Sequence, residues 1–80
     1  MEIRVLAFGI VKDIFEGSEK NISLPAGATV AELRAALKQN FPELENLRSW
    51  MIAVNNTYAD DGLPVREGDE VAIIPPVSGG

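Results

Sequence analysis

The sequence has 80 residues, which is room for one domain and no more. Hydrophobic residues make up 46% and charged residues 24%, and no apolar run reaches the roughly 18 residues that a membrane-spanning helix needs. It has 7 basic and 12 acidic residues, a net charge of -5, and the basic ones are scattered, so we expect neither nucleic acid nor membrane as a partner.

The first elements follow from apolar patterning. Residues 2–10 are rich in Ile, Val, Leu and Phe and predict a strand. Residues 10–16 lie between two glycines and carry apolar residues at helical spacing, which predicts a turn or two of helix. Residues 21–24 predict a second, short strand, which ends at the turn sequence Pro25-Ala26-Gly27.

A longer helix is predicted next. Thr29 is suited to an N-cap, and Glu32 follows it by three residues, which is the spacing of a capping box. The apolar side chains that recur at spacings of three and four are Val30, Leu33, Leu37 and Phe41. Pro42 ends this helix or begins a new short one.

The last part of the sequence predicts strands. Residues 50–54 form the third strand, closed by the turn pair Asn55-Asn56, and Tyr58 begins a small edge strand. Residues 66–69 form a turn before the final strand, 70–74. We therefore predict an α+β fold of the β-grasp, or ubiquitin-like, type, with a mixed sheet of about four or five strands and one main helix on one face.

The first and last strands are apolar on both faces. Side chains alternate along a strand, so Leu6 and Phe8 should lie opposite Ile3, Val5 and Ala7, and Ile74 should lie opposite Ile73. One helix covers only one face, which leaves either a little exposed apolar area or a binding surface. We take Leu6, Phe8 and Ile74 as the candidate contact with a larger partner.

The chain ends Pro75-Pro76-Val77-Ser78-Gly79-Gly80. The two prolines lack N–H groups, so they should end the strand and send the chain away from the sheet as a stiff, extended segment. The glycines lack a β-carbon and can pass through a slot that excludes other residues. We predict a folded domain over residues 1–74 and a flexible tail over residues 75–80.

The sequence contains no cysteine and no histidine. It can form no thiolate nucleophile, Cys/His metal site or serine–histidine pair, so we expect no metal, no bound cofactor and no enzyme activity from the chain alone. The first residues, Met1-Glu2-Ile3-Arg4, do not form a secretory signal, and we expect a cytosolic protein. If the chain carries sulfur, its C-terminal carboxyl group is the place to hold it, after activation by an ATP-using partner.

These residues resemble a family. Residues 68–72 followed by residues 75–80 look like the signature of the molybdopterin synthase small subunit, and residues 5–8, 28–30 and 53–55 support the resemblance. It implies that an E1-like adenylyltransferase uses ATP to adenylate the C-terminal glycine, which becomes a thiocarboxylate. The sulfur then passes, inside the large synthase subunit, to a cyclic pyranopterin precursor to make the dithiolene.

The resemblance carries over by position. It implies that Gly80 holds the sulfur and that the residues threading the partner's active site are Pro75, Pro76, Val77, Ser78 and Gly79. Three other functions share parts of the pattern. They are a thiamine-pathway sulfur carrier, a ubiquitin-like modifier whose last glycine forms isopeptide bonds with lysines, and an interaction domain with an inert tail.

Overall fold

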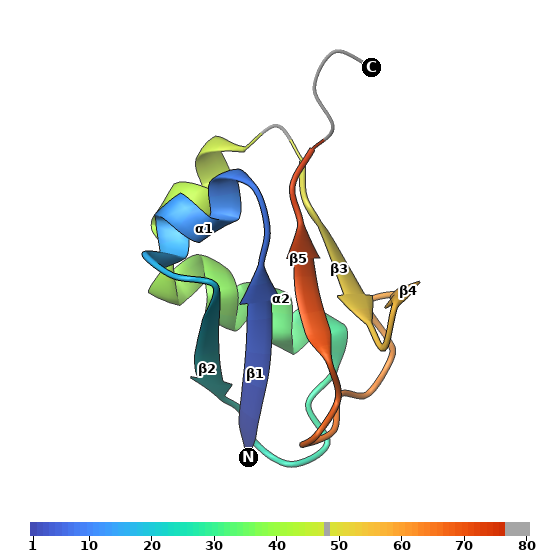
Figure 1. The fold of residues 1–80 in the computed structure, drawn as a ribbon. Helices are drawn as coiled ribbons and strands as arrows, with labels where there is room; N and C mark the ends of the chain where they lie inside the picture. Colours follow the sequence, from blue (N-terminus) through green and yellow to red (C-terminus); the bar gives the residue numbers. More distant parts are fainter. Residues whose placement is uncertain (48, 77–80) are drawn as a thin grey trace.

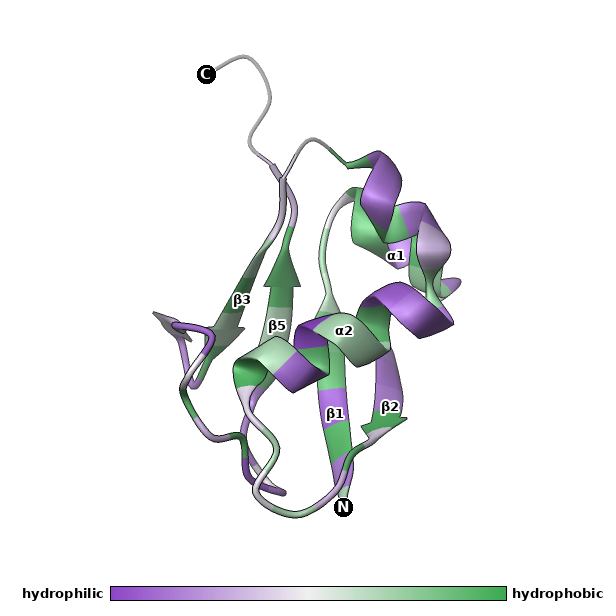
Figure 2. Cartoon of the chain, turned by 180° about the vertical axis from the view of Figure 1, so that it is seen from behind, coloured by the Kyte–Doolittle hydropathy of each residue, from purple (hydrophilic) through white to green (hydrophobic). Residues whose placement is uncertain are grey.

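A computed structural model of the protein describes residues 1–47 and 49–76. Its elements in chain order are β1 (Glu2–Ala7), α1 (Ile10–Phe15), β2 (Glu19–Ser23), α2 (Val30–Asn40), the 3-10 helix η1 (Pro42–Asn46), β3 (Met51–Val54), β4 (Thr57–Tyr58) and β5 (Val71–Ile74). The strands form one five-stranded sheet in the order β2-β1-β5-β3-β4. Figures 1 and 2 show α2 crossing one face of this sheet. The predicted α+β, β-grasp arrangement is confirmed.

Strands β1 and β5 are parallel, and every other neighbouring pair of strands in the sheet is antiparallel. In the parallel pair, Val5 lies beside Val71 and Ala7 beside Ile73. Because parallel strands run the same way, β1 and β5 end at the same edge of the sheet (Figure 1). The residues that follow β1 are thereby brought beside the residues that follow β5.

Helix α2 begins as the sequence predicts. The Thr29 side chain accepts a hydrogen bond from the Glu32 backbone N–H at 3.4 Å, and the Thr29 N–H donates to the Glu32 carboxylate at 3.2 Å. This reciprocal capping box satisfies two N–H groups that have no partner within the helix. Leu33 and Leu37 are fully buried against the sheet, as expected.

The hydrophobic core lies between the sheet and its helices. The inward-facing side chains of β1 and β5 are at most 2% exposed, and Val5 and Val71 have no exposed surface. At the end of the domain near α1, Phe15 stacks on Phe41 with ring centroids 4.4 Å apart, and Leu44 of η1 is buried. In the described part of the chain, no helix is long and apolar enough to span a membrane.

The strand boundaries differ from the prediction by one to three residues at several places; for example, β2 ends at Ser23 rather than at residue 24, and β5 begins at Val71 rather than at residue 70. β1 ends at Ala7 rather than at residue 10, because the chain turns at Phe8 and Gly9 and enters α1. β2 begins two residues early, at Glu19, because Glu19 and Lys20 pair with Leu6 and Val5 of β1. Trp50, predicted to open the third strand in the core, precedes β3 and is half-buried. The turn at Asn55 and Asn56 is confirmed, with φ 51° and 68°, the left-handed values that a tight hairpin requires.

Replacing Leu37 with alanine tests the packing of α2. Leu37 is fully buried, so Leu37→Ala should lower the free energy of unfolding by roughly 2–5 kcal/mol, measured by urea denaturation. Gln39→Ala is the matched control, because Gln39 is exposed on the same helix and its loss should change stability by less than about 0.5 kcal/mol. Equal effects of the two substitutions would contradict this packing.

Candidate functional site

The face of the sheet opposite α2 is apolar over β5, the β3–β4 hairpin and the end of β1, whereas the rest of its β1 and β2 part carries exposed polar residues such as Arg4, Glu19 and Asn21. The strand registers place Leu6, Ala72, Ala53 and Tyr58 in one row across four strands. The next row toward the C-terminal end of β5 contains Ile74 beside Met51. We call this surface the outer face. Leu6, Phe8 and Ile74, the three residues proposed from the sequence, all lie on it or at its edge.

An open depression of about 340 Å³ occupies part of the outer face. Its lining residues are Phe8, Ala53, Asn56, Tyr58, Glu70, Ala72 and Ile74. Phe8 is 46% exposed and Tyr58 is 62% exposed, which is unusual for side chains of this size in a folded domain. Grouped on one surface, they have the character of a protein-binding patch.

Two large exposed residues of the outer face, Met51 and Tyr58, were not proposed from the sequence. Met51 is 49% exposed, and the alternation of Met51 and Ala53 with the buried Ile52 and Val54 could have placed it there. Tyr58 could not have been placed in this way, because its position depends on the pairing of β4 with Ala53.

The proposed tail starts where the sheet ends. Ile74 is the last residue of β5 and pairs with Met51, and Pro75 and Pro76 follow as half-buried residues outside the strand. The predicted end of the strand at Pro75 is confirmed, because proline has no N–H to continue the ladder. Val77, Ser78, Gly79 and Gly80 lie outside the described residues, so their proposed roles stay predictions.

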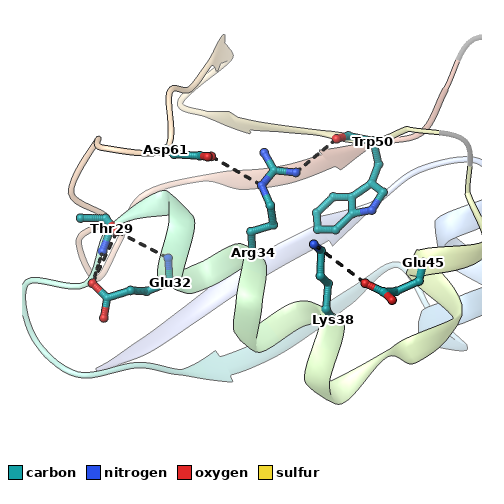
Figure 3. Close-up of polar contacts among 7 residues, drawn as sticks. All are labelled: Thr29, Glu32, Arg34, Lys38, Glu45, Trp50 and Asp61. Atoms are coloured by element: carbon teal, nitrogen blue, oxygen red, sulfur yellow. Dashed lines mark hydrogen bonds and ion pairs between the residues drawn. The ribbon is translucent and has the colours of Figure 1, made fainter.

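Arg34 of α2 holds the segment that enters β3 (Figure 3). Its guanidinium group lies 4.8 Å from the centre of the Trp50 ring and donates a hydrogen bond to the Trp50 carbonyl oxygen at 3.3 Å. Its Nε lies 3.5 Å from an oxygen of Asp61. Trp50 directly precedes Met51, so this contact ties the edge of the outer face to the helix on the other side of the sheet.

Two of the acidic residues near residues 60 and 70 have structural partners. Asp61 pairs with Arg34, and Asp69 accepts hydrogen bonds from the Arg66 backbone N–H at 2.8 Å and from the Asn55 side chain at 3.2 Å. Glu70 lines the outer-face depression instead. In the part of the chain that the structure describes, these carboxylates do not form a metal-binding group.

Residues 5–80 match the family described as ThiS. The chain is 37% identical to a molybdopterin synthase sulfur carrier subunit of Arabidopsis thaliana, with all of this chain and 84% of the relative covered. It also superposes on a chain of the complex of subunits 1 and 2 of molybdopterin-converting factor from Helicobacter pylori. That match has 31% identity, a TM-score of 0.71 and full coverage of both chains. For SAMP1 of Haloferax volcanii the identity is 25%, the TM-score 0.85, and both chains are again fully covered.

The contact between Arg34 and Trp50 can be tested by fluorescence, because Trp50 is the one tryptophan of the sequence. Arg34→Ala removes a hydrogen bond and a cation–π contact, which together should stabilise the fold by about 1–2 kcal/mol. It should also expose the indole and shift its emission to longer wavelength. Asp61→Asn is the control, since it removes only an exposed ion pair and should leave the emission unchanged. Unchanged emission in Arg34→Ala would exclude the contact.

Proposed function

This chain belongs to the ThiS family, and from that premise we propose that it carries sulfur as a thiocarboxylate on Gly80. It is a sulfur carrier subunit of molybdopterin synthase and acts in molybdenum cofactor biosynthesis. The observation that supports Gly80 as the carrier is the sequence Pro75-Pro76-Val77-Ser78-Gly79-Gly80. The family match includes all of these residues, because it extends to residue 80.

The composition supports a terminal carrier. With no cysteine in the sequence, no side chain offers a thiol that can hold and release a sulfur atom. The thioether sulfurs of Met1 and Met51 are bonded to two carbons and are not transferable. A carboxylate at the end of a slender segment remains, and glycine in the last two positions allows it to enter a narrow active site.

The carboxylate needs activation, because its negative charge repels nucleophiles. In this proposal an E1-like adenylyltransferase transfers AMP from ATP to the Gly80 carboxylate and releases pyrophosphate. A persulfide of a donor protein then attacks the carbonyl carbon and expels AMP, which leaves an acyl disulfide. A thiol cleaves its S–S bond, forms a new disulfide with the donor sulfur and leaves the thiocarboxylate on Gly80. All catalytic groups belong to the partners.

The large subunit of molybdopterin synthase is the proposed acceptor partner. The H. pylori chain that this protein resembles belongs to a complex of subunits 1 and 2, which supports a comparable pair here. The outer face, with Leu6, Phe8 and Ile74, is the proposed docking surface, and residues Pro75 to Gly79 would thread the partner's active site. A net charge of -5 favours a partner with a basic surface.

The thiocarboxylate proposal predicts that Gly80 tolerates neither loss nor extension. Deleting Gly80, or adding one alanine after it, should abolish dithiolene formation in a reconstituted synthase. The reactive carbonyl would be displaced, and a displacement of about 1 Å can already slow a reaction on the order of 100-fold. Unfolding by urea should be unchanged in both variants. Normal dithiolene formation by either variant would show that Gly80 is not the carrier.

The docking surface can be tested by introducing charge. Phe8→Asp should weaken binding to the large subunit at least 10-fold, about 1.4 kcal/mol or more, because it places a carboxylate on an apolar interface. Leu63→Asp is the matched control: Leu63 is 42% exposed, against 46% for Phe8, and does not line the outer-face depression. Titration calorimetry measures both. Equal loss of affinity, or unfolding of the Phe8 variant, would contradict the docking surface.

A ubiquitin-like modifier is the second candidate function. The specific observation is the likeness to SAMP1 of H. volcanii, a small archaeal modifier protein, over the full length of both chains. A modifier would form an isopeptide bond between Gly80 and a lysine of another protein. Trapping such conjugates from cells that express the tagged chain would establish this activity, and it would use the same activated carboxyl group.

A further inference from the structure

We propose that Gly9 is a positioning residue for the tail: the turn that contains it abuts Pro75 and sets the direction in which the chain leaves the sheet. This inference rests on the proposed function of Gly80, which it deepens. It assigns a role in sulfur delivery to a residue that lies more than 60 positions from the tail in sequence.

The backbone at Gly9 has a conformation that favours glycine strongly. Its φ is 55° and its ψ is -132°, the values of the first central position in a type II′ turn. The Val11 N–H closes this turn by donating to the Phe8 carbonyl oxygen at 3.0 Å. A residue with a β-carbon is strained at these angles, so glycine allows the chain to leave β1 and enter α1 without an intervening loop.

The turn is firmly anchored on the side away from the tail. Val11 and Phe15, on the helix that it begins, are 0% and 1% exposed. The Lys12 N–H also donates to the Gly9 carbonyl oxygen at 3.1 Å. The turn is therefore held by the core, and a neighbour that packs against it is packed against a fixed surface.

That neighbour is Pro75. A β-carbon built at position 9 would lie 3.2 Å from Pro75 Cγ, closer than side chains normally approach. The other described glycines with left-handed φ, Gly27 and Gly68, would place a β-carbon in open space. Gly9 thus combines two constraints, a left-handed backbone and a close approach, and the close approach is to the first residue of the proposed tail.

The contact matters because Pro75 has no N–H group with which to extend the β5 ladder, which ends at Ile74. Packing can set the direction of the chain at this point, and the Gly9 turn supplies a packing surface beside the proline ring. A change of direction at Pro75 would displace the reactive carbonyl at Gly80, because that carbonyl lies five residues further along the chain.

The test compares Gly9→Ala with Gly27→Ala in the full chain, using the large subunit as acceptor. Both variants introduce a β-carbon at a left-handed φ, but only the first meets Pro75. Gly9→Ala should lower kcat for sulfur transfer roughly 10- to 100-fold, with the Kd for the large subunit changed less than about 3-fold. Gly27→Ala should leave both constants unchanged. Equal kcat values for the two variants would overturn the proposal.

Pro75→Ala and Pro76→Ala keep the proposal testable if Gly9→Ala does not fold. Each removes a proline ring, but only the Pro75 ring meets position 9. Pro75→Ala should lower kcat more than Pro76→Ala, and in the Pro75→Ala background Gly9→Ala should cause no further loss of kcat. Equal losses of kcat in the two proline variants would contradict positioning through Pro75. So would a loss of kcat on adding Gly9→Ala to Pro75→Ala that is as large as in the wild-type background.

Failure of this inference is distinguishable from failure of the proposed function. If Gly80 is not the carrier, either the wild-type chain transfers no sulfur or deleting Gly80 leaves its transfer rate unchanged. If Gly80 is the carrier but Gly9 has no positioning role, the wild type and Gly9→Ala transfer sulfur at the same rate. Whichever function the chain has, a nuclear Overhauser effect between Gly9 Hα and Pro75 Hγ in the wild-type protein should report the contact directly. Its absence would overturn the proposal.

Discussion

The parallel pairing of β1 with β5 is the constraint on which the rest of the structure depends. It joins the first strand to the last at the centre of the sheet, with Val5 beside Val71 and Ala7 beside Ile73. Parallel neighbours need a long crossover connection, and the chain between them supplies α2 as well as the outer strands. Because both central strands end at one edge, the Gly9 turn and Pro75 meet there, and the proposed tail leaves beside the residues that support it.

The same pairing gives the sheet two unlike faces. On one face, buried side chains such as Val5 and Val71 form the core together with α2, whose Leu37 is also buried. On the other face, Phe8, Met51 and Tyr58 remain exposed although they are large and apolar. A domain of this size has one helical layer to cover one face, so the second face is available for a partner. The proposed carrier function uses both features, a face for docking and a tail that starts at its edge.

Much of this arrangement was predictable from local sequence. The capping box at Thr29 and Glu32 located the start of α2, and alternation along the first and last strands placed Leu6, Phe8 and Ile74 on the outer face. Features that depend on contacts between distant segments were not predictable. Tyr58 joins the outer face only through its register with Ala53, and the approach of Gly9 to Pro75 depends on how two strand ends meet. The identity of the sulfur-bearing atom depends on chemistry carried out by partners.

Fragmentation mass spectrometry of the chain after incubation with ATP, an E1-like adenylyltransferase and a persulfide donor tests the central claim most directly. The account predicts that one oxygen of the chain is replaced by sulfur and that every fragment bearing this change contains Gly80. Omitting ATP should prevent the exchange. Sulfur found on any other residue, or an unmodified Gly80 in a chain that still supports dithiolene formation, would contradict the account.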